Sequence, residues 1–129
     1  MGGHEMAGTL RVKPGTTFAY HPAGFRILEA VRATALKLDI DVTITSGSDG
    51  LHSGPSDPHH SGEAYDLRTK DLPQPVKVAL LAGIRDELGE DEPNRRFYTF
   101  LEAPGTSNEH LHCQRRKGTS YSMLDYLNR

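Results

Sequence analysis

The chain has 129 residues, of which 36% are hydrophobic and 25% are charged, and its formal net charge is −2. These values are typical of one ordinary folded domain and exclude a disordered chain. A net charge so close to zero offers no general attraction to nucleic acid or to an anionic membrane. No apolar run has the length of a membrane span, so we expect neither nucleic acid nor a membrane as a partner.

Cysteine usage and the N-terminal segment bear on the compartment. The only cysteine is Cys113, which excludes an intrachain disulfide. Residues 1–16 lack the basic-then-apolar pattern of a signal peptide. We therefore expect a monomer made and folded in a cytoplasm, and any action outside the cell would need another means of release.

The first half of the chain predicts a strand, a helix and a second strand. Residues 9–13 are typical of a short edge strand, and residues 41–47 alternate apolar and polar side chains, as a half-buried strand does. Between them, residues 21–40 predict a helix, with Pro22 in its first turn. The apolar side chains of this helix recur at spacings of three and four, at Leu28, Val31, Ala35 and Leu38.

The middle of the chain predicts a long loop, a strand and a second helix. Residues 46–62 are almost entirely turn formers and histidines, and residues 63–69 can form a strand. A helix opens at Pro73 and Pro75 and ends near Gly89. Its apolar positions follow steps of four, at Val76, Leu80, Ile84 and Leu88.

The last third predicts two strands and a terminal helix. Residues 95–103 and 109–114 are β-prone and are separated by a turn, and residues 122–128 can form a short helix. The order of elements predicts a single α+β domain over residues 1–129. We expect a mostly antiparallel sheet with two main helices packed on it.

Histidines and carboxylates gather in two segments. Five of the seven histidines are His52, His59, His60, His110 and His112. A catalytic zinc site needs three nitrogen or oxygen ligands, an open fourth position and a nearby base. Two imidazoles and one carboxylate would come from His59, His112 and Asp66, which leaves Glu109 free to accept a proton from a metal-bound water.

Both segments match the signature of a known family. The stretch HHSGEAYD contains H-x-x-G-x-A-x-D from His59 to Asp66, and EHLH contains E-x-x-H from Glu109 to His112. Together they resemble the zinc D-Ala-D-Ala carboxypeptidase and L-Ala-D-Glu endolysin peptidase family, whose fold is shared with the hedgehog signalling domain. The resemblance spans roughly residues 42–114, which is most of the chain.

The resemblance implies a zinc peptidase with an α+β hedgehog/DD-peptidase-like fold. His59, Asp66 and His112 would bind Zn²⁺, and Glu109 would be the general base. The substrate would be the peptide part of bacterial peptidoglycan, and the absence of a signal peptide and of a wall-binding domain resembles a phage endolysin. The bond cleaved could be L-Ala-D-Glu, a D-Ala cross-link or terminal D-Ala-D-Ala.

The chain departs from the family pattern at two places. Asp57 stands two residues before His59, where the family usually has serine. The family also tends to carry an arginine just after the strand that ends in Ser-Gly, and here Ser48 and Asp49 follow. Side chains that could supply the missing charge, or contact the substrate, are Arg68, His52 and His110.

Two assignments within the motifs have alternatives. His59 rather than His60 has the seven-residue spacing to Asp66 that the motif requires. In the second motif, His110 and His112 would share a strand face and could both bind one zinc ion. Glu109 and His112 are three residues apart, so they would face opposite sides of a regular strand. The role of Glu109 as a base therefore requires that it precede the regular strand.

Other functions are also consistent with these residues. The domain could hold zinc structurally and recognise a wall peptide or a protein without cleaving it. A third hypothesis is a protein that binds no metal and whose histidines are close together only incidentally.

Overall fold

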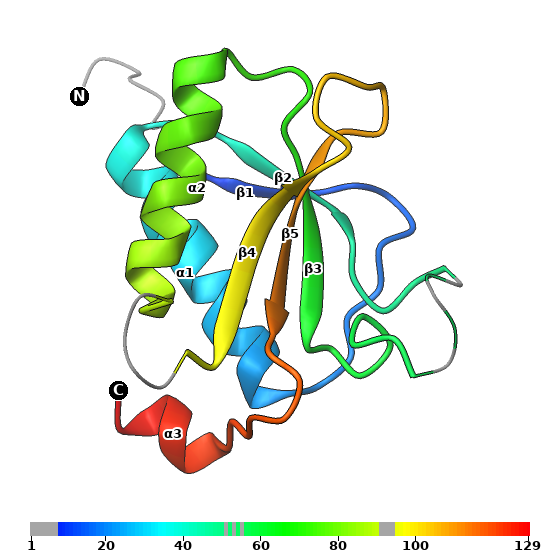
Figure 1. Cartoon of the computed structure of the whole chain (residues 1–129), viewed down its shortest axis with the longest axis vertical. Helices are drawn as coiled ribbons and strands as arrows, with labels where there is room; N and C mark the ends of the chain where they lie inside the picture. The colour runs from blue at the N-terminus through cyan, green and yellow to red at the C-terminus, as the bar shows by residue number, and fades with distance from the viewer. Residues whose placement is uncertain (1–7, 51, 53, 55, 91–94) are drawn as a thin grey trace, which may run out of the picture.

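The computed structural model describes residues 8–50, 52, 54, 56–90 and 95–129 of the chain. Five strands and three helices make up the described fold (Figure 1). The strands are β1 Leu10–Val12, β2 Val42–Ser46, β3 Ala64–Arg68, β4 Phe97–Glu102 and β5 His110–Arg115. The helices are α1 Pro22–Leu38, α2 Gln74–Leu88 and α3 Met123–Leu127.

The strands form one mixed sheet in the order β1-β2-β3-β5-β4. The edge strand β1 pairs with β2 in parallel, and the other three pairs are antiparallel. Parallel pairing needs a crossover connection, and α1 supplies it between β1 and β2. The predicted α+β class and mostly antiparallel sheet are confirmed.

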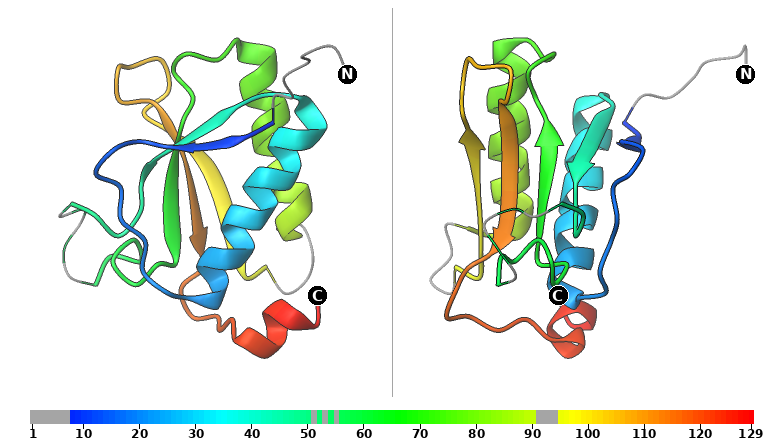
Figure 2. Two further views of the ribbon diagram at one scale, coloured as in Figure 1. Left: turned by 180° about the vertical axis from the view of Figure 1, so that it is seen from behind. Right: turned by 90° about the vertical axis from the view of Figure 1, so that its right-hand side faces the viewer.

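Helices α1 and α2 pack on one face of the sheet, and the loop between β2 and β3 lies at the other face (Figure 2). Side chains alternate along a strand, so each strand sends one set of residues towards the helices. In β5 these are Leu111 and Cys113, which are buried among apolar side chains of α1 and α2 such as Ile27 and Leu80. The other set faces outward, and we call this side of the sheet the open face.

The ends of the two long helices follow from their sequences. The backbone N–H of Ala23 donates to His21 Nδ1, 3.0 Å away, at the start of α1. Asp39 takes a left-handed conformation with φ 55°, which ends α1 at Leu38, two residues before the predicted end. Gly89, with φ 66°, ends α2 in the same way, as its sequence predicted.

The remaining predicted elements lie within two residues of their expected bounds. The loop over residues 46–62 contains neither helix nor further strand among its described positions. Residues 51, 53 and 55 of this loop, and the acidic pair and proline at 91–93, lie outside the described residues. Within the described ranges, no helix has the length and apolar character to cross a bilayer.

Gly62 sets the path by which the loop returns to the sheet. Its φ of 79° lies in the left-handed region, and a Cβ added there would lie 2.3 Å from the carbonyl oxygen of Ala19. Gly24, in α1, is as closely approached, because a Cβ there would lie 2.1 Å from the carbonyl oxygen of Gly62. The loop can therefore enter β3 along this route only with glycine at both positions.

Replacing Gly62 by alanine should destabilise the fold. Left-handed strain costs about 1–2 kcal/mol and the backbone collision a further 1–3 kcal/mol or so. Gly118→Ala is the matched control, because Gly118 has φ 81° and open space where a Cβ would lie. Chemical denaturation should show a clearly larger loss for Gly62→Ala. Equal losses would show that the loop can move away from Ala19 at no cost.

Candidate metal centre

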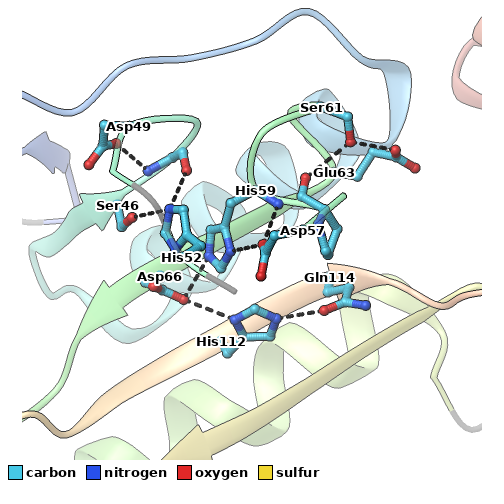
Figure 3. Close-up of polar contacts among 12 residues, drawn as sticks. Ser46, Asp49, His52, Asp57, His59, Ser61, Glu63, Asp66, His112 and Gln114 are labelled. Carbon is cyan, nitrogen blue, oxygen red and sulfur yellow. Dashed lines mark hydrogen bonds and ion pairs between the residues drawn. The ribbon is translucent and has the colours of Figure 1, made fainter. Parts of the chain in front are cut away.

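Strand pairing brings an aspartate and a histidine together on the open face. In the antiparallel pair of β3 and β5, Asp66 lies opposite His112 and Arg68 lies opposite His110. Residues directly opposite on one face of such a pair are close neighbours. His112 Nδ1 lies 3.0 Å from Asp66 Oδ1 (Figure 3).

His59 reaches the same carboxylate oxygen from the loop between β2 and β3. Its Nε2 lies 3.1 Å from Asp66 Oδ1, and its side chain is almost fully buried. Ligand atoms around a tetrahedral zinc are about 3.3 Å apart for bonds of about 2.0–2.1 Å. Both nitrogen–oxygen distances are close to that edge length. The structure thus brings together the three residues that the sequence predicted as metal ligands.

The second ring nitrogen of His59 and of His112 also has a hydrogen-bond partner. Asp57 Oδ1 lies 2.7 Å from His59 Nδ1, and Gln114 Oε1 lies 2.8 Å from His112 Nε2. Metal-binding histidines almost always donate their other N–H to such an acceptor, which fixes the tautomer and the ring orientation. This arrangement leaves His59 Nε2 and His112 Nδ1 as the ring nitrogens that face Asp66.

Asp57 and Gln114 are functional candidates that sequence reasoning missed. Asp57 was noted only as a departure from the family serine, and its Oδ1 also accepts the backbone N–H of His59 at 2.9 Å. An aspartate side chain often accepts the backbone N–H of the residue two positions later in a local turn, and this tendency could have identified Asp57. Gln114 lies two residues after His112 on the same strand face, so the alternation of β5 could have placed it there.

The charges of the site favour a bound cation. Burial acts to lower the pKa of His59, but hydrogen bonds and charge interactions with Asp66 and Asp57 outweigh it and raise that pKa. The pKa of His112 is raised in the same way, against burial, by Asp66 and Gln114. Burial acts to raise the pKa of Asp66, but hydrogen bonds from His112 and His59 hold it well below its usual range. The site therefore concentrates negative charge between nitrogens that a divalent ion can use in place of protons.

His52 is a second histidine beside His59. Ligand atoms of His52, His59 and Asp66 lie within 4.8 Å of one another, a grouping that does not include His112. However, the rings of His52 and His59 are stacked, with centroids 3.8 Å apart and planes 3° apart. The nitrogen lone pairs lie in the ring planes, so two stacked rings cannot both point at one ion. The planes of His59 and His112 are inclined by 66°, which permits convergence.

His52 therefore covers the His59 ring in this structure. Its Nε2 lies 3.1 Å from Ser46 Oγ and 3.2 Å from the carbonyl oxygen of Gly47, both at the end of β2. We assign His112 rather than His52 as the third ligand of the candidate centre.

His110 stands next to the three ligands. Its Nδ1 lies 2.7 Å from the carbonyl oxygen of Asn108, which can only accept, so Nδ1 carries the hydrogen. Its Nε2 lies 2.9 Å from Glu102 and 3.8 Å from Asp66 Oδ1. Arg68, opposite His110, lies farther along the open face and approaches Asp71 at 3.8 Å.

Glu109 is not brought to the three ligands. It does precede the regular strand, as its expected role required, because β5 begins at His110. Its carboxylate nevertheless turns to the helix side, where Lys77 Nζ of α2 lies 2.7 Å away and Thr69 donates at 2.9 Å. The Lys77 hydrogen bond, followed by one from the backbone N–H of Gly105, lowers the pKa of Glu109 to about 2. Such a weakly basic carboxylate, already paired, is poorly suited to accept a proton.

Comparisons with known proteins give no further guidance. No family model, no curated protein and no solved structure matches the chain.

The candidate centre should bind about one zinc ion per chain. His59→Ala, Asp66→Asn and His112→Ala should each abolish binding, because each removes a ligand. His60→Ala is the control, since this neighbour is not one of the ligands. Zinc content should be measured by elemental mass spectrometry after dialysis without chelators. If His52→Ala abolishes binding while His112→Ala retains it, the ligand set is His52, His59 and Asp66.

Asp57→Ala should weaken zinc binding without abolishing it. The loss of an acceptor behind a metal-binding histidine typically costs about 10–100-fold in affinity. Competition with a chromogenic chelator would measure this change. An unchanged affinity would mean that the contact between Asp57 and His59 serves only the loop.

The Glu109–Lys77 pair should contribute to stability in a pH-dependent way. The pKa of Glu109 is lowered from 4.5 to about 2 in the fold, so its contribution is present above pH 4.5 and is lost as the pH falls towards 2. Thermal unfolding of the wild type and of Glu109→Gln should therefore differ near neutral pH and converge in acid. A constant difference across this range would contradict the assignment.

Proposed function

We propose that this chain is a zinc-dependent peptidase that cleaves the peptide part of bacterial peptidoglycan, with a hedgehog/DD-peptidase-like fold and an endolysin-type role. One observation carries the proposal: two imidazoles converge on one carboxylate, with an acceptor behind each ring. The five-stranded sheet, with this cluster on its open face, is consistent with the fold that the sequence motifs resemble.

His59, Asp66 and His112 would hold the metal. Three protein ligands leave a fourth position open, as catalytic rather than closed structural zinc sites do. Zinc bound there would supply a Lewis acid and lower the pKa of a water molecule towards neutrality. Asp57 and Gln114 accept from the two imidazoles, which leaves the other ring nitrogens of His59 and His112 facing Asp66.

His110 is the side chain best placed to move a proton. His110 Nδ1 donates to the carbonyl oxygen of Asn108, and Glu102, 2.9 Å from Nε2, accepts a hydrogen bond from that nitrogen when it is protonated. Nε2, beside the cluster, is therefore the atom through which His110 would gain or lose a proton. Glu109, which the E-x-x-H motif implied as the base, is paired with Lys77. We therefore propose His110 in its place.

Aromatic side chains beside the cluster could support a bound peptide. Tyr98 and Phe100 of β4 lie half-buried on the open face, with their rings stacked at a centroid distance of 5.6 Å. The Phe100 ring lies 5.2 Å from that of His112. An extended peptide crossing the ligands would contact this apolar strip.

A non-catalytic zinc domain is the second candidate. The pairing of Glu109 with Lys77 favours it, because the carboxylate that the family motif uses in catalysis is engaged elsewhere. In this alternative the same three residues would hold zinc, and the open face would bind a wall peptide or a protein without cleavage.

Digestion of purified peptidoglycan by the zinc-loaded protein tests the proposal. Mass spectrometry of the released fragments should show peptide bonds cleaved in a zinc-dependent manner. His110→Gln should lower the rate by roughly 10²–10⁴-fold, because a positioned proton carrier contributes about that much. Its zinc content should not change, and Glu109→Gln should stay within a few-fold of the wild type where it remains folded.

Two results would alter the conclusion. A protein with full zinc content that releases no fragment would support the binding domain. A large loss in Glu109→Gln, with zinc retained and His110→Gln active, would restore Glu109 as the base.

A further inference from the structure

A basic groove lies at the end of the sheet where β4 begins and β5 ends, above α3 in Figure 1. It is an open depression of about 800 Å³. Three arginines line it, Arg95 and Arg96 before β4 and Arg116 after β5. No residue that we assign to the candidate metal centre or to proton transfer lines this groove. The proposed reaction therefore uses none of its charges.

The pairing of β4 with β5 brings two basic runs of the chain together. Phe97 lies opposite Arg115, and the backbone N–H of Arg116 donates to the carbonyl oxygen of Arg96 at 2.8 Å. Residues 95–96 and 115–117, all five of which are arginine or lysine, thus meet at this end of the sheet. Like charges at opposed positions of a strand pair repel one another. A bound anion would relieve this repulsion.

Acidic residues that the structure describes balance only part of this charge. Arg115 is paired with Glu63, and Arg96 lies 3.0 Å from Asp125, the only carboxylate among the described residues of the groove. Ion pairs with described residues are absent for the other three cations, which are Arg95, Arg116 and Lys117. The groove therefore keeps an excess of positive charge, although the whole chain has a net charge of −2.

Neutral hydrogen-bond donors accompany the cations at the turn after β5. The backbone N–H of Thr119 donates to the carbonyl oxygen of Arg116 at 3.2 Å, and Gly118 between them has φ 81°. Open space lies where a Cβ of Gly118 would be, so a ligand can approach the backbone of this turn closely. The exposed Ser120 hydroxyl, which also lines the groove, can donate as well. A phosphate group accepts several such bonds at once, and a guanidinium offers it two parallel N–H groups.

The groove suits a phosphodiester polymer better than a single small ion or a nucleic acid. A depression of about 800 Å³ that is open to solvent has room for several linked groups. The guanidinium of Arg116 lies over the Tyr98 ring at 5.3 Å, and that of Arg96 lies over the Tyr121 ring at 4.8 Å. Those ring faces are covered, so they cannot stack on bases as the aromatic side chains of single-strand-binding proteins do.

The groove is separated from the candidate metal centre along β5. Arg116 follows His112 by four residues, which is about 14 Å of extended strand. A phosphate bound at Arg116 would not contact a peptide bond placed at Asp66. The groove would therefore retain the chain on its substrate and would take no part in the chemical step.

We propose that this groove binds the phosphodiester backbone of an anionic wall polymer of the poly(glycerol phosphate) kind. The cations and the neutral donors favour a phosphodiester. The choice of a wall polymer as its source rests on the proposed function, which places the chain at bacterial peptidoglycan. Arg95, Arg116 and Lys117 bind the phosphates, and the groove holds the chain beside the peptides that it cleaves.

Titration of soluble poly(glycerol phosphate) into the full metal-free chain tests the groove by calorimetry. Arg95→Gln/Lys117→Gln removes two exposed cations and should lower the affinity about tenfold, because two phosphate contacts are lost. Lys13→Gln/Arg32→Gln is the matched control, since it removes two exposed cations elsewhere and changes the net charge equally. Its affinity should stay within about twofold of the wild type. Equal losses in the two double variants, or no binding by the wild type, would overturn the groove.

Other anions identify the class of ligand. Inorganic phosphate, polyglutamate and a single-stranded oligonucleotide, each at the same concentration of charged groups, should bind at least about tenfold more weakly than poly(glycerol phosphate). Inorganic phosphate that binds as tightly as the polymer would identify a site for small ions. Polyglutamate or the oligonucleotide binding as tightly would identify a different partner. Each of these three results would overturn the proposed polymer.

The failure of this inference is distinguishable from the failure of the proposed function. Selective polymer binding by a zinc-loaded chain that releases no fragment from peptidoglycan would retain the groove and overturn the peptidase. Hydrolysis of purified, polymer-free peptidoglycan by a chain that does not bind the polymer would retain the peptidase and overturn the groove.

Discussion

The carboxylate of Asp66 is the group on which the arrangement of the open face depends. One of its oxygens contacts His112 of the neighbouring strand and His59 of a loop. The strand register sets the first contact, and the path of the loop sets the second. Because Asp66 is largely enclosed and ionised, it requires positively polarised partners, and burying it without them would be costly. Zinc held by His59 and His112 would supply positive charge at this carboxylate.

The side chains of β5 alternate between the open face of the sheet and the core. His110, His112 and Gln114 alternate onto the open face, whereas Leu111 and Cys113 enter the core beneath α1. Just before the strand, Glu109 turns towards Lys77 of α2. On the helix side this carboxylate gains an ion pair with Lys77 and a hydrogen bond from Thr69. The proposed shift of the proton carrier from Glu109 to His110 follows from this division.

Two ligands of the candidate centre lie on paired strands, and the third lies on a loop. Asp66 and His112 are held by a strand pair, while His59 depends on a loop whose return path is confined at Gly62. Asp57 then fixes the His59 ring through a two-residue turn.

Much of this could be predicted from the sequence because its determinants are local. Apolar spacing defined both long helices, alternation defined the strands, Gly89 ended α2, and the seven-residue step selected His59 over His60 as the partner of Asp66. These features depend only on helical and extended periodicities and on the conformational freedom of glycine.

Only the tertiary structure decided the partners that lie far apart in the chain. The parallel pairing of β1, the contacts of His59 and His112 with Asp66, and the pairing of Glu109 with Lys77 all depend on packing. A motif specifies residue types and spacing along the chain. It does not specify which face a residue takes at the start of a strand, because that choice depends on the partner that packing places on each side.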